Sequence, residues 1–361
     1  PNNFYRLNSK FFMNNLKYRK LLTKISFKEL SKIAIYAIRF SIIGVGIVIT
    51  TGVILPVLNS KYRTSSYSTT YFNNNLLFRE KFLNSDTKKF AARELINLKK
   101  QLESINTKYP NVEPKAWFLD LDSNTYVNFN GTKSIAAAST IKIPILVAFF
   151  EKVDAGDISL DQMITMDKEI IVGGSGNMQY METGKQFTAL EIARKMIIIS
   201  DNTATELLIR QIGGKLFLNE RFKKWGMRQT VINNSLPDLD GTNRTSPEDL
   251  AKLLLKIEKG NLISLRSRDR FLNIMRETKT KTLLPKGLER NASIAHKTGD
   301  IGTIIADAGI IDMPTGRRYI GAIFVERDYD DPAGRELIQN FSKTIYPVSY
   351  THLTLPTKWI V

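Results

Sequence analysis

The N-terminal quarter of the chain divides into a basic segment and an uncharged apolar run. Residues 40–58 form the run, nineteen residues without a charged side chain. As a helix it would extend roughly 28 Å, close to the thickness of a bilayer's hydrocarbon core. Residues 1–39 hold nine Lys or Arg side chains against one acid, Glu29. This asymmetry predicts a transmembrane anchor, with residues 1–39 in the cytoplasm and everything after Leu58 exported to a periplasmic or other extracytoplasmic space.

Two other interpretations of this region are weaker. A cleaved secretory signal would also export the rest of the chain, but no small-x-small cleavage motif follows the run. A nucleic-acid-binding arm would use the basic charge, but the segment adjoins an apolar run and contains no recognisable binding module. We therefore expect a membrane partner and no nucleic acid.

Beyond the anchor, a polar linker over residues 59–86 leads to a globular domain over residues 87–346. Phe90, Leu95, Leu98 and Leu102 recur at helical spacing and predict an amphipathic helix. Strands are predicted at 116–121, 125–129, 293–297, 303–311 and 318–325, around a helical block from 139 to about 255 and before a closing helix at 335–346. Strands at both ends with helices between them predict an α+β fold, an antiparallel sheet flanked by helices with a helical lobe beside it.

The last fifteen residues, 347–361, are predicted to lie outside this domain. Pro347 is expected to end the closing helix, and the segment resembles translated read-through more than native protein. On that interpretation His352 is not native, and His296 is the only histidine of the domain.

Composition limits the chemistry that the domain can perform. The 361 residues include no cysteine and two histidines, which excludes disulfides, thiolate nucleophiles and a three-histidine zinc site. No metal or organic cofactor is expected. The formal charge of +17 indicates an anionic partner, and the basic N-terminal segment already accounts for close to half of it.

Three short motifs combine residue types that serve nucleophilic catalysis. They are Ser139-Thr140-Ile141-Lys142, Ser200-Asp201-Asn202 and Lys297-Thr298-Gly299. Each has a structural interpretation of its own, respectively an N-cap, helix capping, and a strand that ends in a turn. Ser-x-x-Lys alone is common by chance, but the two fixed tripeptides are rare, so the three together favour chemistry.

The surroundings of the first motif support a nucleophile and a base. Ser139 is predicted to open an apolar helix, whose N-terminus carries partial positive charge and suits a serine that must become an oxyanion. Lys142 follows one turn later on the same face. Because histidine is so scarce, Lys142 is the candidate base. Burial and a neighbouring ammonium such as Lys297 would lower the pKa of Lys142 far enough for that role.

In these motifs and their order, residues 90–346 resemble the class A β-lactamases and penicillin-recognising serine hydrolases. The resemblance implies that Ser139 is the acylated nucleophile, Lys142 its proton acceptor, Ser200 a proton relay to the leaving nitrogen, and Asn202 an orienting group. The implied substrate-binding residues are Lys297, Thr298, Gly299 and Asp300, of which the first two would hold the substrate carboxylate. The backbone N–H groups of Ser139 and Asp300 would form the oxyanion hole, and Asp201 is expected to be a helix cap.

The chain departs from this family in the omega loop. That loop normally supplies a glutamate for deacylation in a Glu-x-x-Leu-Asn pattern. Here the corresponding interval, residues 231–247, contains no glutamate and is followed by Glu248. Asp238 or Asp240 is a possible deacylation carboxylate, although a shorter side chain on a shorter loop can miss its target by an ångström. We therefore expect acylation by β-lactams more strongly than efficient turnover.

Three functions are compatible with these residues. The first is a membrane-anchored β-lactamase-like hydrolase of the β-lactam amide bond, of the kind that confers antibiotic resistance. The second is a slow-deacylating D,D-peptidase or penicillin-binding protein that acts on a D-alanyl peptide. The third, a non-catalytic cell-wall-binding module, is disfavoured because every nucleophilic and carboxylate-binding group is retained.

Overall fold

The computed structural model describes residues 93–351 of the chain. The predicted cytoplasmic segment, anchor and linker, residues 1–86, lie outside the described residues. Between residues 93 and 351, no helix has both the length and the apolar character that a membrane crossing requires.

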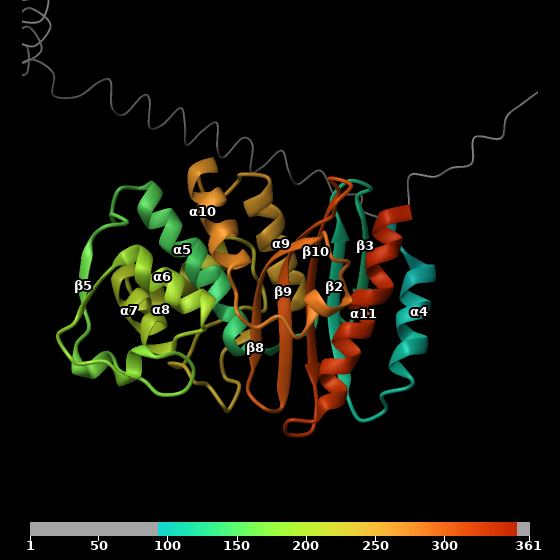
Figure 1. The fold of residues 1–361 in the computed structure, drawn as a ribbon, viewed down its shortest axis with the longest axis horizontal. Coiled ribbons are helices and arrows are strands. Elements are labelled where there is room, and N and C mark those ends of the chain that lie inside the picture. Colours follow the sequence, from blue (N-terminus) through green and yellow to red (C-terminus); the bar gives the residue numbers. More distant parts are fainter. Residues whose placement is uncertain (1–92, 352–361) are drawn as a thin grey trace, which may run out of the picture. The chain divides into compact units, whose positions relative to one another are not determined.

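A six-stranded sheet forms the centre of the domain (Figure 1). Its strands are β1 (Arg93–Glu94), β2 (Glu113–Asp120), β3 (Thr125–Phe129), β8 (Ser293–Asp300), β9 (Ile304–Asp312) and β10 (Arg318–Glu326). They lie in the order β1-β3-β2-β10-β9-β8, so that N-terminal and C-terminal strands meet at the β2–β10 pair. The predicted α+β fold is confirmed, but the sheet is mixed and not purely antiparallel, because β1 pairs in parallel with β3.

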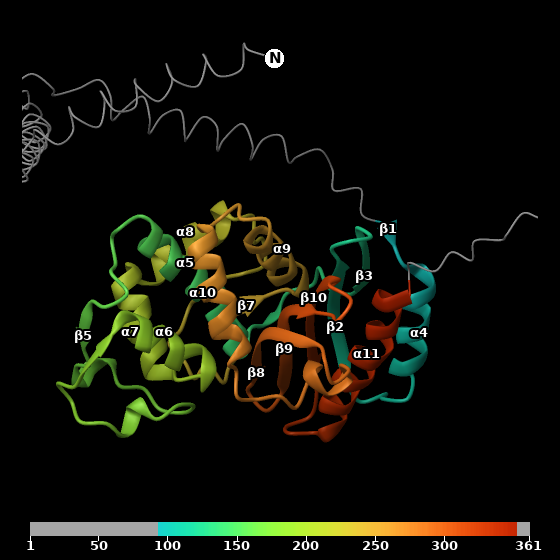
Figure 2. The same ribbon diagram turned by 45° about the horizontal axis from the view of Figure 1, so that its top comes forward.

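Both faces of the sheet are covered, which explains why β9 and β10 are apolar almost throughout. One face packs against α4 (Ile96–Asn106) and the long C-terminal helix α11 (Pro332–Thr351). The opposite face packs against a helical lobe and shares its hydrophobic core. Figure 2 shows the lobe next to β8, and α4 and α11 on the other side of the sheet from the lobe.

The helical lobe is built around one buried helix. Its helices are α5 (Lys142–Asp154), α6 (Ala189–Ile198), α7 (Asn202–Ile212), α8 (Gly214–Lys224), α9 (Pro247–Glu258) and α10 (Leu265–Arg276). Two short two-stranded sheets complete it, one of β4 (Ile135–Ala136) with β7 (Arg244–Thr245), and one of β5 (Met163–Thr165) with β6 (Gln186–Thr188). Helix α5 is buried without interruption from Lys142 to Phe150, so its position is fixed by packing on all sides.

The structure corrects the predicted limits of the first and last helices. The first helix begins at Ile96, because residues 93–95 are extended: Arg93 N–H donates to the Asn124 carbonyl and Leu95 N–H to the Tyr126 carbonyl. The last helix does not end before Pro347 but continues to Thr351. Pro347 removes one backbone donor on an exposed turn, where water can hydrate the carbonyl that loses its partner.

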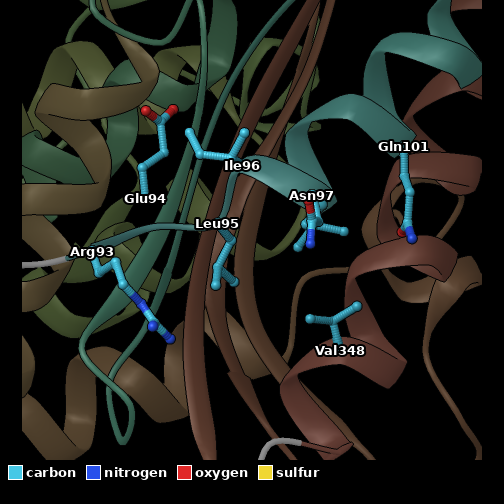
Figure 3. A pocket seen from close by; sticks show the side chains of 8 residues that line it. Arg93, Glu94, Leu95, Ile96, Asn97, Gln101 and Val348 are labelled. Atoms are coloured by element: carbon cyan, nitrogen blue, oxygen red, sulfur yellow. The ribbon is translucent and has the colours of Figure 1, made fainter.

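A pocket of about 400 Å³ lies where β1 meets α4 and the end of α11 (Figure 3). Leu95, Asn97, Gln101 and Val348 are among its lining residues. Because β1 and β8 are opposite edges of the sheet, this pocket is remote from the three sequence motifs.

Candidate active site

Ser139 lies in a tight turn that precedes the buried helix. The turn is a 3-10 helix over Ala138–Ile141, and α5 begins only at Lys142, one turn later than the sequence predicts. Ala138 has a φ of 45°, a left-handed conformation that costs a non-glycine residue about 1–3 kcal/mol. Hydrogen bonds around the turn hold this geometry, from Ala137 N–H to the Asn243 carbonyl at 2.8 Å and from the Thr140 hydroxyl to the Ala137 carbonyl at 2.6 Å.

Lys142 connects the first motif to the second. Its side chain is fully buried, and its Nζ lies 3.3 Å from Ser139 Oγ. The same nitrogen lies 2.7 Å from the Ser200 carbonyl oxygen, 3.1 Å from Ser200 Oγ and 2.8 Å from Asn202 Oδ1. One amine therefore contacts both hydroxyls and the carboxamide that the sequence singles out.

The surroundings of Lys142 favour its neutral form. Burial lowers the pKa of Lys142 well below its ordinary value, and the ammonium of Lys297 lowers it further, while Asp201 and Glu206 act in the opposite direction. A neutral amine has two N–H groups and one lone pair. The N–H groups suit the Ser200 carbonyl and Asn202 Oδ1, which leaves the lone pair for the Ser139 hydroxyl.

The second motif lies at the start of α7. Ser200 has a φ of 58°, which turns the chain immediately before the helix. Asp201 is the N-cap, as predicted, and its Oδ1 accepts the Ala204 N–H at 2.9 Å. Asn202 Nδ2 donates to the Gly173 carbonyl at 2.9 Å, so the glycine-rich loop over residues 173–177 packs directly against this motif.

The third motif lies on β8, an edge strand of the sheet whose residues from Ala295 to Gly299 are buried. Gly299 permits its approach to the nucleophile, because a Cβ at this position would lie 2.9 Å from Ala138 Cβ and 3.0 Å from Ser139 N. Lys297 is buried, and burial lowers its pKa to about 8, against an opposing effect of Asp307. The Lys297 ammonium donates to the Thr298 carbonyl at 2.7 Å.

Asp300 ends β8 and is held from outside the motif. The Arg327 guanidinium, which is 2% exposed, contacts both carboxylate oxygens of Asp300 at 2.9 and 3.0 Å. Asp300 Oδ1 also accepts the Gly302 N–H at 2.9 Å. These contacts fix the backbone at the end of the strand, where the resemblance implies an oxyanion-hole donor.

The two omega-loop aspartates are not brought into contact with this constellation. Asp238 is buried, and its carboxylate accepts hydrogen bonds from Thr242 Oγ1 at 2.8 Å and Asn243 N–H at 2.6 Å, within its own loop. Asp240 is exposed to solvent. The structure therefore places one aspartate in a loop turn and the other on the surface.

Leu236 is a position that the sequence analysis missed. When Leu239 is aligned with the leucine of the Glu-x-x-Leu-Asn pattern, Leu236 occupies the position of the glutamate. Its side chain is buried, and its N–H donates to Glu206 Oε1 at 3.4 Å. The next residue, Pro237, lies near the site, because a Cβ on Gly174 would meet both Pro237 and the Asn202 side chain. The shared leucine was the signal that could have located this position.

Comparisons with known proteins identify the family of the chain. The model of the beta-lactamase enzyme family matches residues 97–348. A beta-lactamase of Bacteroides uniformis is 24% identical over 279 residues, which cover 71% of this chain and 92% of that protein. The extended-spectrum beta-lactamase PER-1 of Pseudomonas aeruginosa is 26% identical over 271 residues, 69% of this chain and 86% of that protein.

Solved structures give a stronger likeness. The structure of PBP-A is 50% identical, with a TM-score of 0.70, and the match covers 71% of this chain and 97% of that one. A mutant of PBP-A, with the same identity and TM-score, has been solved as an acyl-enzyme complex with penicillin G.

Fold, motifs and matches together define a penicillin-recognising serine hydrolase. The chain belongs to the beta-lactamase enzyme family, whose model covers more than half of its length.

Proposed function

We propose that the chain forms an acyl-enzyme on Ser139 and hydrolyses it slowly, as a penicillin-binding D,D-peptidase does. The observation that carries this proposal is the position of Lys142 Nζ, which lies within 3.3 Å of Ser139 Oγ, Ser200 Oγ and Asn202 Oδ1. The neutral amine takes the proton of Ser139 while Oγ attacks the carbonyl carbon of the substrate.

The proton then travels to the leaving group. As the C–N bond breaks, the Lys142 ammonium passes a proton through the Ser200 hydroxyl, 3.1 Å away, to the nitrogen that departs. The carbonyl oxygen takes up negative charge in this step. The backbone N–H groups of Ser139 and Asp300 are the donors that would stabilise it, and the close approach of Gly299 to Ser139 N supports that pairing.

The substrate carboxylate is assigned to Lys297 and Thr298. An ammonium and a hydroxyl at a sheet edge form a charge-assisted contact with a carboxylate, which both β-lactams and D-alanyl peptides carry. Asn202 would hold the substrate amide, since its Nδ2 and Oδ1 are fixed by Gly173 and Lys142.

Slow hydrolysis is supported by the omega loop. Leu236 offers no base at the position of the family glutamate, and the Asp238 carboxylate is already used inside the loop. The 50% identity to PBP-A points in the same direction. Efficient β-lactam hydrolysis is the second candidate, and the 92% coverage of the Bacteroides uniformis beta-lactamase supports it.

Intact mass of the full chain, followed over time after penicillin G is added, separates these functions. We expect rapid gain of one penicillin mass and persistence of the adduct for many minutes, with no adduct in Ser139→Ala. Fast return to the free mass with loss of the drug would establish a β-lactamase. A persistent adduct in Ser139→Ala would exclude Ser139 as the nucleophile.

We also propose that residues 40–58 anchor the enzyme in a membrane with the catalytic domain exported. The uncharged run and the nine basic side chains before it support this orientation. The full chain, made in a bacterial host, should stay in the membrane fraction after carbonate washing, and protease added to intact spheroplasts should cut the domain. A domain that is protected until the cells are lysed would contradict the export.

A further inference from the structure

One buried acid near Lys142 belongs to none of the three motifs. Glu206 is 8% exposed and follows Asn202 by four residues, so both side chains lie on one face of α7. Asn202 is a direct contact of Lys142. Glu206 therefore lies one helical turn from Asn202, the residue whose carboxamide contacts the amine of Lys142.

Glu206 also contacts the omega loop at the position that lacks the family glutamate. Its Oε2 accepts the Ser235 hydroxyl at 3.0 Å, and its Oε1 accepts the Leu236 N–H at 3.4 Å. Lys215 of α8 donates to the same Ser235 hydroxyl at 3.2 Å. Glu206 therefore connects α7 to the segment of the omega loop that contains Leu236.

The charged groups around Lys142 come from few elements. Lys297 faces it from β8, and Asp201 and Glu206 face it from α7 and its N-cap. Both acids raise the pKa of Lys142, against burial and Lys297. Asp201 is also a helix cap that binds the N–H groups of Asn177 and Met178, so Glu206 is the acid whose charge can be removed without dismantling the motif.

We propose that Glu206 is a positioning residue for acylation: it holds Ser235 and Leu236 against α7, and its buried negative charge acts on the amine of Lys142. This inference rests on the proposed role of Lys142 as the base. Glu206 makes no contact with Ser139, and no bond to the substrate is assigned to it.

The substitution Glu206→Gln tests the charge separately from the contacts. The carboxamide oxygen can still accept the Leu236 N–H, and its NH2 group can donate to the Ser235 oxygen. Loss of the negative charge lowers the pKa of Lys142, so more of the amine is neutral at acid pH. The acid limb of the pH–rate profile, where protonation of Lys142 slows acylation, should therefore move to lower pH. At pH values within the acid limb of the parent chain, the variant should acylate several-fold faster than the parent.

Stopped-flow acylation of the full chain by nitrocefin, from pH 4.5 to 9, gives the measurement, with a thermal melt at each pH. Glu151→Gln is the matched control, because Glu151 lies on the same helix as Lys142 but pairs with Arg221 at 2.6 Å. It should keep the parent profile. Glu206→Asp keeps the charge, and it should keep the acid limb in place even where the shorter side chain lowers the melting temperature.

Each outcome decides the inference. An acid limb that stays in place in Glu206→Gln, with or without a lower rate at every pH, overturns it and leaves Glu206 a structural residue. A selective fall in deacylation also overturns it, because Glu206 would then act on the hydrolytic water. If the parent chain fails to acylate at any pH, the proposed function itself is wrong, and that result is distinct from an unmoved limb.

Discussion

The serine–lysine cluster and the omega loop line the same site but use their polar groups in opposite ways. In the cluster, Lys142 Nζ contacts three side-chain oxygens: the hydroxyls of Ser139 and Ser200 and the carboxamide oxygen of Asn202. In the loop, the Asp238 carboxylate accepts hydrogen bonds from Thr242 Oγ1 and Asn243 N–H, both within the loop itself.

This difference shows that the two halves of a hydrolytic cycle can be separated within one fold. Acylation needs a nucleophile, a base and an oxyanion hole, and the cluster supplies groups suited to all three. Deacylation needs in addition a base that orients water. In this chain Leu236 occupies the position that aligns with the family's glutamate. Local folding explains the contrast, because carboxylates in a short loop are drawn into capping its backbone N–H groups.

The largest expected effect comes from adding the base that the loop lacks. Leu236→Glu places a carboxylate next in the chain to Pro237, which lies, like the Asn202 side chain, close to Gly174. General-base catalysis contributes about 10²–10⁴-fold, so deacylation should rise by about 10²-fold or more while acylation stays within a few-fold. Intact mass and steady-state nitrocefin turnover measure the two steps separately.

Leu236→Gln is the control for this variant, since glutamine has the same size and polarity but is not a base. Equal deacylation in the two variants would show that polarity or loop disruption, and not a base, produces the change. No gain in either would show that the loop differs from the family in position as well as in residue type.

How much of this contrast the sequence predicts depends on the range of the interactions involved. Strand 125–129 and the Asp201 cap are local patterns, and both agree with the structure. Strand β8 runs to Asp300, past the predicted end at 297, because Gly299 packs on the Ser139 turn, a contact that connects residues far apart in the chain. The parallel pairing of the two-residue strand β1 has no periodic pattern to reveal it.

The site shows the same division. The motifs indicated Ser139, Lys142, Ser200 and Asn202 through residue type and order alone, and the structure brings these four side chains together. Glu206 escaped notice because its significance depends on where the omega loop passes α7. No spacing rule within α7 predicts that path.

An intermediate effect on the acylation rate is expected from substitution of Asp307, the acid that raises the pKa of Lys297. Asp307 is opposite Thr298 in the strand register, and its carboxylate is held by His296 Nδ1 at 2.8 Å and by Leu284 N–H. Burial lowers the pKa of Lys297 to about 8, and Asp307 opposes that fall. Asp307→Asn removes the opposing charge, so the pKa falls below 8 and the ammonium is lost at lower pH.

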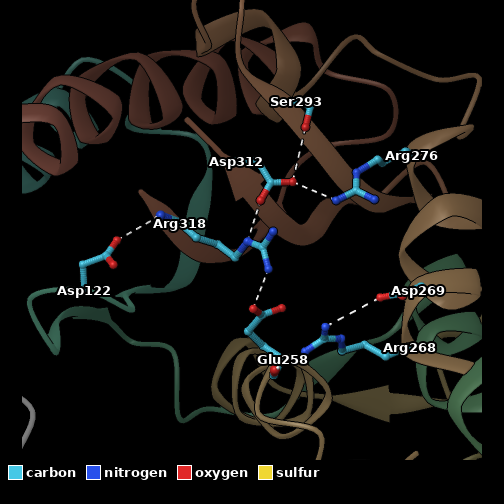
Figure 4. Close-up of polar contacts among 8 residues, drawn as sticks. All are labelled: Asp122, Glu258, Arg268, Asp269, Arg276, Ser293, Asp312 and Arg318. Atoms are coloured by element: carbon cyan, nitrogen blue, oxygen red, sulfur yellow. Dashed lines mark hydrogen bonds and ion pairs between the residues drawn. The ribbon is translucent and has the colours of Figure 1, made fainter. Parts of the chain in front are cut away.

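The alkaline limb of acylation, which we expect near pH 8, should therefore move toward neutral pH, with a several-fold loss of rate at pH 8 and little change at pH 6. Asp312→Asn is the matched control. Asp312 lies on the same strand but at the far end, where it pairs with Arg276 at 2.9 Å and with Arg318 (Figure 4). It should lower stability and leave the limb in place, and a shift in both variants would remove the role of Asp307.

The smallest effect on catalysis is expected from the omega-loop aspartates. Asp238→Asn weakens charge-assisted hydrogen bonds to Thr242 Oγ1 and Asn243 N–H in a buried turn, which should cost about 1–3 kcal/mol of unfolding free energy by urea titration. Asp240→Asn, on an exposed side chain, should change neither stability nor rate measurably. The deacylation rate should stay within about twofold in both variants, because an uninvolved carboxylate contributes nothing to the step. A tenfold fall in either would identify a base within the loop, and the separation between an intact acylation half and an incomplete hydrolytic half would no longer hold.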